Sequence, residues 1–296
     1  MRLMRTTQEP PFGVSEFTTW PWKFEQDVEH YARLSVDTIE VCEFKLDPQR
    51  AAEQLALIKS SGLTISSVQP RVHALYPDSM NPAPKQPADR VPLYRQTIEL
   101  FGKAAPGVTL VAITGAAPAG NYREAFEVAA REYRLLADYA ADHGVRIGLE
   151  PLNPNLMNTD TILCTLPDAI RLVEEVNRPS FGVFLDVWHV WQDPLVHEHI
   201  RACGDRIFGV HINDWHMPRS FGDRAIIGQG EMDLPPLLQT IAETGYDGAY
   251  MLELFSTLDL PDSLWKGDMS SVITKSRDGF QNAWQKAFPE GNLTHG

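Results

Sequence analysis

Long apolar runs are absent from this sequence of 296 residues. None approaches the length of about 20 residues that a membrane-spanning helix needs, so we expect no contact with a membrane. The opening stretch MRLMRTTQEPPFGV contains two arginines but no apolar region, and it therefore predicts no signal peptide. Cysteine is also scarce: Cys42, Cys164 and Cys203 are widely spaced and form no Cys-x-x-Cys pair. This pattern favours reduced thiols in a cytoplasmic protein.

Positive charge is in short supply as well. The sequence has 26 Lys and Arg residues against 39 Asp and Glu residues, which gives a formal net charge of −13 and an isoelectric point near 5.1. Sequence-independent binding of nucleic acid relies on clustered Lys and Arg, so we expect no nucleic-acid partner. The hydrophobic residues that are present, 43% of the chain, are enough for a sizeable core.

Short β-rich runs alternate with amphipathic helical patterns along the chain. The expected strands are Gly13–Thr18, Thr38–Phe44, Thr64–Gln69, Val108–Thr114, Val145–Pro151, Phe181–Val187, Ile207–Ile212 and Ala249–Phe255. Several of them, such as VTLVAIT and FGVFLDV, are apolar on both faces, which is typical of parallel strands covered on each side. The clearest helical patterns are Glu124–His143, Leu166–Val176 and Leu234–Thr244.

Strict strand–helix alternation predicts a parallel sheet with right-handed crossovers, and eight repeats close into a barrel. We therefore expect an α/β protein with a single (β/α)₈ TIM barrel domain over residues 1–296, with the barrel itself running from about 12 to 288. An open doubly wound sheet is the alternative, but no Gly-x-Gly-x-x-Gly follows the first strand. The segment Tyr76–Pro92, which holds five prolines, is expected to be a long loop after the third strand.

Ionisable residues end four consecutive expected strands. They are Glu150 in GLEPLN, Asp186 in FLDVWH, His211 in VHINDWH and Glu253 in MLELF. A single buried acid or histidine could be a structural residue satisfied by hydrogen bonds, but four at equivalent positions point to one site, because the carboxyl ends of barrel strands converge on one mouth. Three carboxylates and an imidazole suit one divalent metal ion: Mn²⁺ is expected, and Mg²⁺, Co²⁺ or Zn²⁺ also fit.

In these motifs the chain resembles the xylose-isomerase-like barrels, in particular the sugar isomerase/epimerase superfamily. The resemblance rests on the order and spacing of GLEPLN, LDVWH, VHIND, DRAIIGQGEMD and GYDGAYMLELF. It implies that the four residues named above are metal ligands, that His189 points at the substrate, and that Arg224 contacts it. One departure is Leu156, which stands where ketose epimerases of this group carry a second acid.

The resemblance implies proton transfer beside a carbonyl through an enediolate, with Glu150 and Glu253 serving opposite faces of the substrate. We expect an isomerase or epimerase of a keto-sugar or related polyol, with a small carbohydrate-like substrate as its partner. Gln69 and His73 are further candidate substrate contacts. Of Glu40 and Glu43, which point to opposite faces of the second strand, only one can reach the barrel interior. Barrels of this kind often associate through their outer helices, so a homo- or hetero-oligomer is also an expectation.

Other classes of function differ from this one in the residues that they need. The same enolate chemistry could expel a substituent, as in a lyase that cleaves a keto-glycoside, for example in C-glycoside deglycosylation. A metal-dependent hydrolase also stays open. A DNA-repair nuclease of the endonuclease-IV type would need three zinc ions, but ITGAAPAG holds no histidine and Asp223–Arg224–Ala225 replaces Asp-x-His. A barrel that only binds ligands would not keep all four positions filled.

Overall fold

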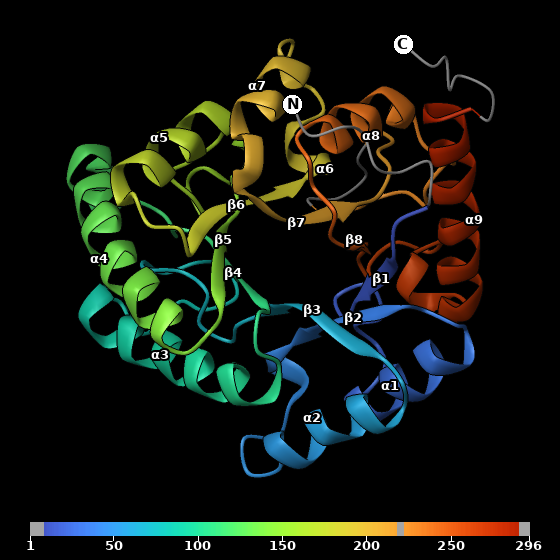
Figure 1. Ribbon diagram of the computed structural model, residues 1–296, viewed down its shortest axis with the longest axis horizontal. Coiled ribbons are helices and arrows are strands. Elements are labelled where there is room, and N and C mark those ends of the chain that lie inside the picture. The colour runs from blue at the N-terminus through green and yellow to red at the C-terminus, as the bar shows by residue number, and fades with distance from the viewer. Residues whose placement is uncertain (1–8, 218–221, 290–296) are drawn as a thin grey trace.

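The computed structural model describes residues 9–217 and 222–289, and these form a closed barrel of eight parallel strands in the order β1 to β8 (Figure 1). The strands are β1 Phe12–Ser15, β2 Thr38–Cys42, β3 Thr64–Gln69, β4 Thr109–Ala112, β5 Arg146–Leu149, β6 Phe181–Asp186, β7 Ile207–Ile212 and β8 Tyr250–Leu252. Each overlaps the strand expected from the sequence, and β3 and β7 match it to the residue. The prediction of a (β/α)₈ barrel is therefore confirmed.

Helices surround the barrel as an outer ring (Figure 1). They are α1 Phe24–Arg33, α2 Ala51–Ser60, α3 Pro87–Ala104, α4 Tyr122–Asp142, α5 Leu166–Val176, α6 Val187–Val190, α7 Val196–Cys203, α8 Leu234–Glu243 and α9 Met269–Ala287. Their buried faces carry the apolar residues that the sequence pattern placed there, such as Leu136 and Ala140 on α4. No helix in the described ranges is both long and apolar enough to cross a membrane.

The expectation of one loop over Tyr76–Pro92 is wrong at its C-terminal end, because α3 already begins at Pro87. A proline is tolerated there since the first N–H groups of a helix have no partner within the helix. Pro92 lies inside the helix, where tertiary contacts outweigh its poor propensity. The fully buried Arg90 supplies such contacts: its guanidinium donates to the carbonyls of Ala74, Asn81 and Pro84 and to the Asp78 carboxylate.

Strand register brings the chemistry-bearing residues to one end of the barrel. Asp186 at the end of β6 pairs with His211 on β7, and His211 pairs with Met251 on β8. Glu253 follows the last residue of β8, and Glu150 follows the last residue of β5. All four thus lie at the carboxyl ends of adjacent strands, where active sites of such barrels are found.

Candidate metal centre

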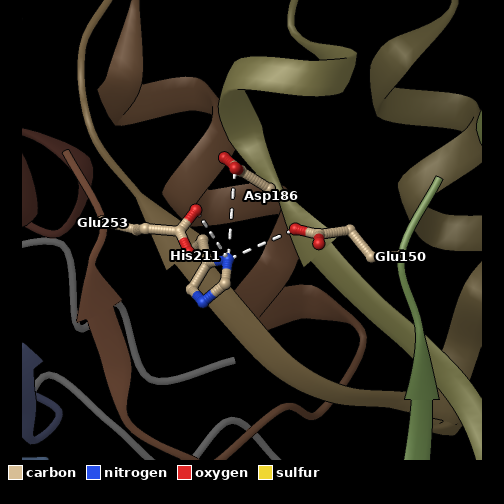
Figure 2. A group of neighbouring side chains, drawn as sticks. All are labelled: Glu150, Asp186, His211 and Glu253. Atoms are coloured by element: carbon tan, nitrogen blue, oxygen red, sulfur yellow. Dashed lines mark hydrogen bonds and ion pairs between the residues drawn. The ribbon is translucent and has the colours of Figure 1, made fainter. Parts of the chain in front are cut away.

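Glu150, Asp186, His211 and Glu253 form one buried cluster, in which each offers a ligand atom within 4.8 Å of the others. Figure 2 shows Glu150 and Glu253 approaching His211 from opposite sides and Asp186 from a third direction. The Nδ1 atom of His211 lies 3.3 Å from Glu150 Oε1 and 3.4 Å from Glu253 Oε2. It lies 4.0 Å from Asp186 Oδ2. The sequence therefore identified the residues that the fold brings together.

The two oxygens of Asp186 show that the cluster suits a metal ion. Oδ1 accepts hydrogen bonds from the Trp188 backbone N–H at 2.8 Å and from Asn213 Nδ2 at 3.0 Å, which fixes the carboxylate. Oδ2 is buried and has no hydrogen-bond partner. A buried charged oxygen needs a cation near it, and in this structure that cation is the Arg224 guanidinium, whose Nη1 atom lies 2.9 Å from Oδ2. Together with a donor set of three carboxylates and one imidazole, this oxygen makes the buried cluster a candidate divalent metal site whose preferred metal is not determined.

The close packing of carboxylates in a buried site shifts their pKa values. Burial raises the pKa of Glu253 to about 8, and the nearby charges of Glu150 and Glu40 add to this effect. Burial also raises the pKa of Glu150. For Asp186, burial opposes ionisation, but Arg224, the two neighbouring histidines and the Trp188 backbone N–H together outweigh it, so the pKa is lowered. Burial lowers the pKa of His211, but the charges of Glu253 and Glu40 and the hydrogen bonds with Glu150 and Glu40 together raise it well above its usual value. The metal-free cluster therefore tends to bind protons, which offset part of the negative charge of its carboxylates.

Arg224 lies directly against the cluster. Its Nη1 atom donates to Glu253 Oε2 at 2.8 Å and lies 2.9 Å from Asp186 Oδ2. The guanidinium is sandwiched between the rings of Trp188 and Phe255, each 5.0 Å from it. Its Nε atom is buried and makes no hydrogen bond within the protein. An oriented, buried cation therefore stands beside the carboxylates.

His189 also lies at the cluster and is held in one tautomer. Its Nδ1 accepts a hydrogen bond from the Asn153 backbone N–H at 2.9 Å, so the ring carries its proton on Nε2. That Nε2 lies 3.7 Å from Asp186 Oδ2. Burial lowers the pKa of His189 to about 3, so the ring is neutral at ordinary pH. It can donate one hydrogen bond at the mouth of the site.

The two remaining candidates have different surroundings. Gln69 lies inside the barrel, and its Nε2 is 3.4 Å from both Glu253 Oε1 and Glu40 Oε1. His73 contacts the carbonyl of Pro70 through Nδ1 at 3.0 Å, and its Nε2 lies 3.9 Å from Asp78 Oδ1. None of the polar interactions found among the described residues joins His73 to the cluster. The structure thus brings Gln69, but not His73, against the four residues.

Two residues of the site were not among the sequence-derived candidates. Glu40 on β2 is fully buried, and both of its carboxylate oxygens lie 3.0 Å from His211 Nε2. Asn213 donates to Asp186 Oδ1 and to the carbonyl of Glu253 at 3.3 Å. Strand alternation had narrowed the choice in β2 to Glu40 or Glu43, but it could not say which glutamate faced inward. No pattern in the sequence singled out Asn213.

Known proteins with similar sequences include an epimerase and a dehydratase. An L-ribulose 3-epimerase from Methylomonas sp. is 33% identical over 144 residues, which are 47% of this chain and 45% of the relative. A 3-dehydroshikimate dehydratase from Pseudomonas putida is 34% identical over 136 residues, which are 42% of this chain and 20% of the relative. The alignments cover less than half the length of either curated relative.

Solved structures and a family model match most of the chain. The crystal structure of the IOLI protein with a binding zinc atom superimposes with a TM-score of 0.78 at 20% identity, covering 94% of this chain and 99% of that one. At this identity the likeness shows the fold. The model of the xylose isomerase-like TIM barrel family matches residues 28–274. The match confirms the resemblance seen in the motifs, and the chain belongs to the xylose isomerase-like TIM barrel family.

Proposed function

We propose that the protein is a divalent-metal-dependent isomerase or epimerase of a keto-sugar or related polyol. The observation that carries the proposal is the placement of Glu150 and Glu253 on opposite sides of one buried cluster that suits a metal ion (Figure 2). Two carboxylates facing each other across a bound substrate can remove a proton from one face and return one to the other. The relation to an L-ribulose 3-epimerase supports this reaction class.

In this proposal Glu150, Asp186, His211 and Glu253 hold the ion, for which Mn²⁺ is our first choice. When bound, the ion supplies Lewis acidity that polarises the substrate carbonyl and acidifies the adjacent C–H. Glu253 and Glu150 each accept or donate a proton through a carboxylate oxygen. Removal of a proton by one glutamate and delivery of a proton by the other to the opposite face of the same carbon gives epimerisation, and delivery to the neighbouring carbon gives isomerisation.

Arg224 and His189 have the substrate-orienting roles in the proposal. The Arg224 Nε–H is buried without a partner, and the His189 Nε2–H is fixed by the Asn153 contact. Both are therefore donors prepared before substrate arrives, which lowers the cost of ordering them in the transition state. Gln69, held between Glu40 and Glu253, fixes the orientation of the Glu253 carboxylate.

A lyase that enolises a keto-sugar and then eliminates a substituent is the second candidate. Two observations favour it. One relative is a dehydratase, whose name denotes an elimination. In addition, Leu156 packs with Ala74, Ile113 and Leu152 in a small apolar cluster beside the end of β5, where ketose epimerases of this group carry an acid. With a leucine at that position, the chain lacks the second acid that a ketose epimerase of this group would use there.

Incubation of the protein with a panel of ketoses, inososes and keto-glycosides in D₂O, with Mn²⁺ or with EDTA, tests the proposal. We expect deuterium to enter the carbon beside the carbonyl of at least one compound with Mn²⁺ and not with EDTA. Mass spectrometry separates an epimer, whose formula changes only by the exchanged deuterium, from an elimination product, which loses a fragment. Exchange that continues after verified metal removal would refute the metal-dependent mechanism.

A further inference from the structure

The imidazole of His211 contacts carboxylates on both of its nitrogen atoms. Nδ1 faces Glu150 and Glu253 at 3.3 and 3.4 Å. Nε2 faces the opposite way, toward Glu40, whose two oxygens both lie 3.0 Å from it. His211 and Glu40 are each fully buried. The imidazole of His211 therefore connects two groups inside the barrel. One is the cluster at the ends of β5–β8, and the other is Glu40 on β2.

Glu40 is itself held by residues of the strands beside β2. The Ser67 hydroxyl donates to Glu40 Oε2 at 2.6 Å, and Gln69 Nε2 lies 3.4 Å from Oε1. Against the effect of burial, Ser15 on β1 also acts with His211 and Ser67 to lower the pKa of Glu40. The two halves of the barrel thus differ in role: β5 to β8 deliver the cluster, whereas β1 to β3 build a polar support behind one of its members.

This support decides which nitrogen of His211 is available to a cation. A neutral imidazole carries one N–H, and the carboxylate of Glu40 can only accept a hydrogen bond. The proton is therefore drawn to Nε2, and Nδ1 is left with a lone pair aimed at Glu150, Asp186 and Glu253. Carboxylates placed behind a ligating imidazole in this way fix its tautomer and orientation and raise its basicity.

We infer that Glu40 is a positioning residue that holds His211 as an Nδ1 ligand and thereby sets the metal affinity of the site. The inference rests on the proposed metal centre, but it concerns a residue on the other side of the barrel that would not touch the ion. Glu43 provides a matched control, because it is a carboxylate three residues along the same segment that accepts instead from the Arg71 backbone N–H and the Thr97 hydroxyl.

The test is a titration of the metal-free full-length protein with Mn²⁺ alone, by isothermal titration calorimetry and without substrate. E40A is expected to weaken binding by roughly 10- to 100-fold, the range seen when such a supporting carboxylate is removed. E40Q keeps the volume and one neutral acceptor, so its loss is smaller but measurable. E43Q should bind as the wild type does. Unchanged affinity in E40A, or in E40Q if E40A does not fold, overturns the inference.

A second readout reports the tautomer directly. In protein with ¹⁵N-labelled histidine and bound Zn²⁺, we expect His211 to show a slowly exchanging proton on Nε2, which is lost in E40A and kept in E43Q. An Nε2 proton that is equally protected in E40A would contradict the inference.

The H211A variant separates failure of this inference from failure of the proposed function. If the wild type binds Mn²⁺ no more tightly than H211A, the metal centre is wrong and the role of Glu40 falls with it. If the wild type binds tightly and E40A binds equally well, only the role of Glu40 falls. If E40A loses affinity but no compound is enolised, the role of Glu40 stands and the proposed reaction fails.

Discussion

The guanidinium of Arg224 lies 2.9 Å from Asp186 Oδ2, the same buried oxygen that no hydrogen bond satisfies. Both groups are almost fully buried, so little solvent screens the attraction between them. Arg224 stands where it would repel a cation held by Asp186, yet it also neutralises part of the charge that crowds the cluster. Its two effects on the site have opposite signs and can be measured separately.

Replacing Arg224 with Met is therefore expected to strengthen Mn²⁺ binding several-fold while it weakens the metal-free protein. Removal of one partner from a buried ion pair typically costs about 3–5 kcal/mol, because the other charge is left uncompensated. Calorimetry with Mn²⁺ and denaturant unfolding of the metal-free protein measure the two effects. Weaker Mn²⁺ binding by R224M would show that Arg224 supports the ion rather than opposing it.

Metal binding should also appear as thermal stability. A ligand that binds only the folded state adds about 2.7 kcal/mol when present at 100 times its Kd. For a chain of this size, we expect Mn²⁺ to raise the Tm by several degrees, at roughly 2–4 °C for each kcal/mol. D186N removes the carboxylate whose Oδ2 is available to the ion and should abolish the increase. D138N, which alters an exposed aspartate paired with Arg178, should keep it.

The sequence predicts the fold and the residues at the strand ends, but not the long-range contacts between side chains. Eight alternations were enough for the barrel, because strand–helix repeats leave few ways to bury both faces of a parallel sheet. Glu150, Asp186, His211 and Glu253 could be found because each is an ionisable residue at the end of an apolar strand. Such a residue is too costly to bury without a partner.

The partners of these four residues could not be predicted. Glu40 and His211 are 171 positions apart in the sequence, and their contact depends on how far each side chain reaches across the closed barrel. The start of helix α3 was not predicted, because the prolines of this segment indicate a loop. The contacts of Arg90 that stabilise the helix are formed only in the folded chain. Local patterns identify strands and their ends, whereas long-range side-chain contacts need the three-dimensional fold.

The affinity for metal should fall as the pH is lowered through the neutral range. In the metal-free protein, burial raises the pKa of Glu253 to about 8, and the charges of Glu253 and Glu40 raise that of His211. Glu253 therefore carries a proton below this pH, and His211 keeps its second proton to a higher pH than an ordinary imidazole, so a cation must displace protons from both. We expect Mn²⁺ to bind more tightly at pH 8 than at pH 6 and to release protons. Calorimetry in buffers of different ionisation enthalpy measures the release, and a Kd independent of pH over this range would contradict it.

Asp214 is expected to control the position of Arg224 without touching the cluster. Its carboxylate accepts the backbone N–H groups of Trp215, Gly228, Gly230 and Met232. Its backbone pairs with Ala225, the neighbour of Arg224. D214N replaces charge-assisted hydrogen bonds, each worth about 1.5–3 kcal/mol, with weaker ones. We expect lower stability and a lower kcat/KM, with Mn²⁺ affinity little changed.

Two further variants test this prediction for Asp214, one that should reproduce the effect of D214N and one that should have no effect. G230A should behave like D214N, because a Cβ at Gly230 would lie 2.3 Å from Asp214 Oδ1. D233N alters an exposed aspartate in the same segment that forms no side-chain cap on α8, and it should behave like the wild type. Equal kcat/KM in D214N and D233N would mean that Arg224 does not depend on this loop.

The most direct test of the proposed chemistry compares deuterium exchange in E253Q, E150Q and the control E43Q, each loaded with Mn²⁺ and given the compound that the wild type enolises. A general acid or base typically contributes about 10²- to 10⁴-fold, so we predict a loss of that order in E253Q and E150Q and none in E43Q. Exchange at the wild-type rate in both E253Q and E150Q would contradict the account, because neither glutamate could then be moving the proton.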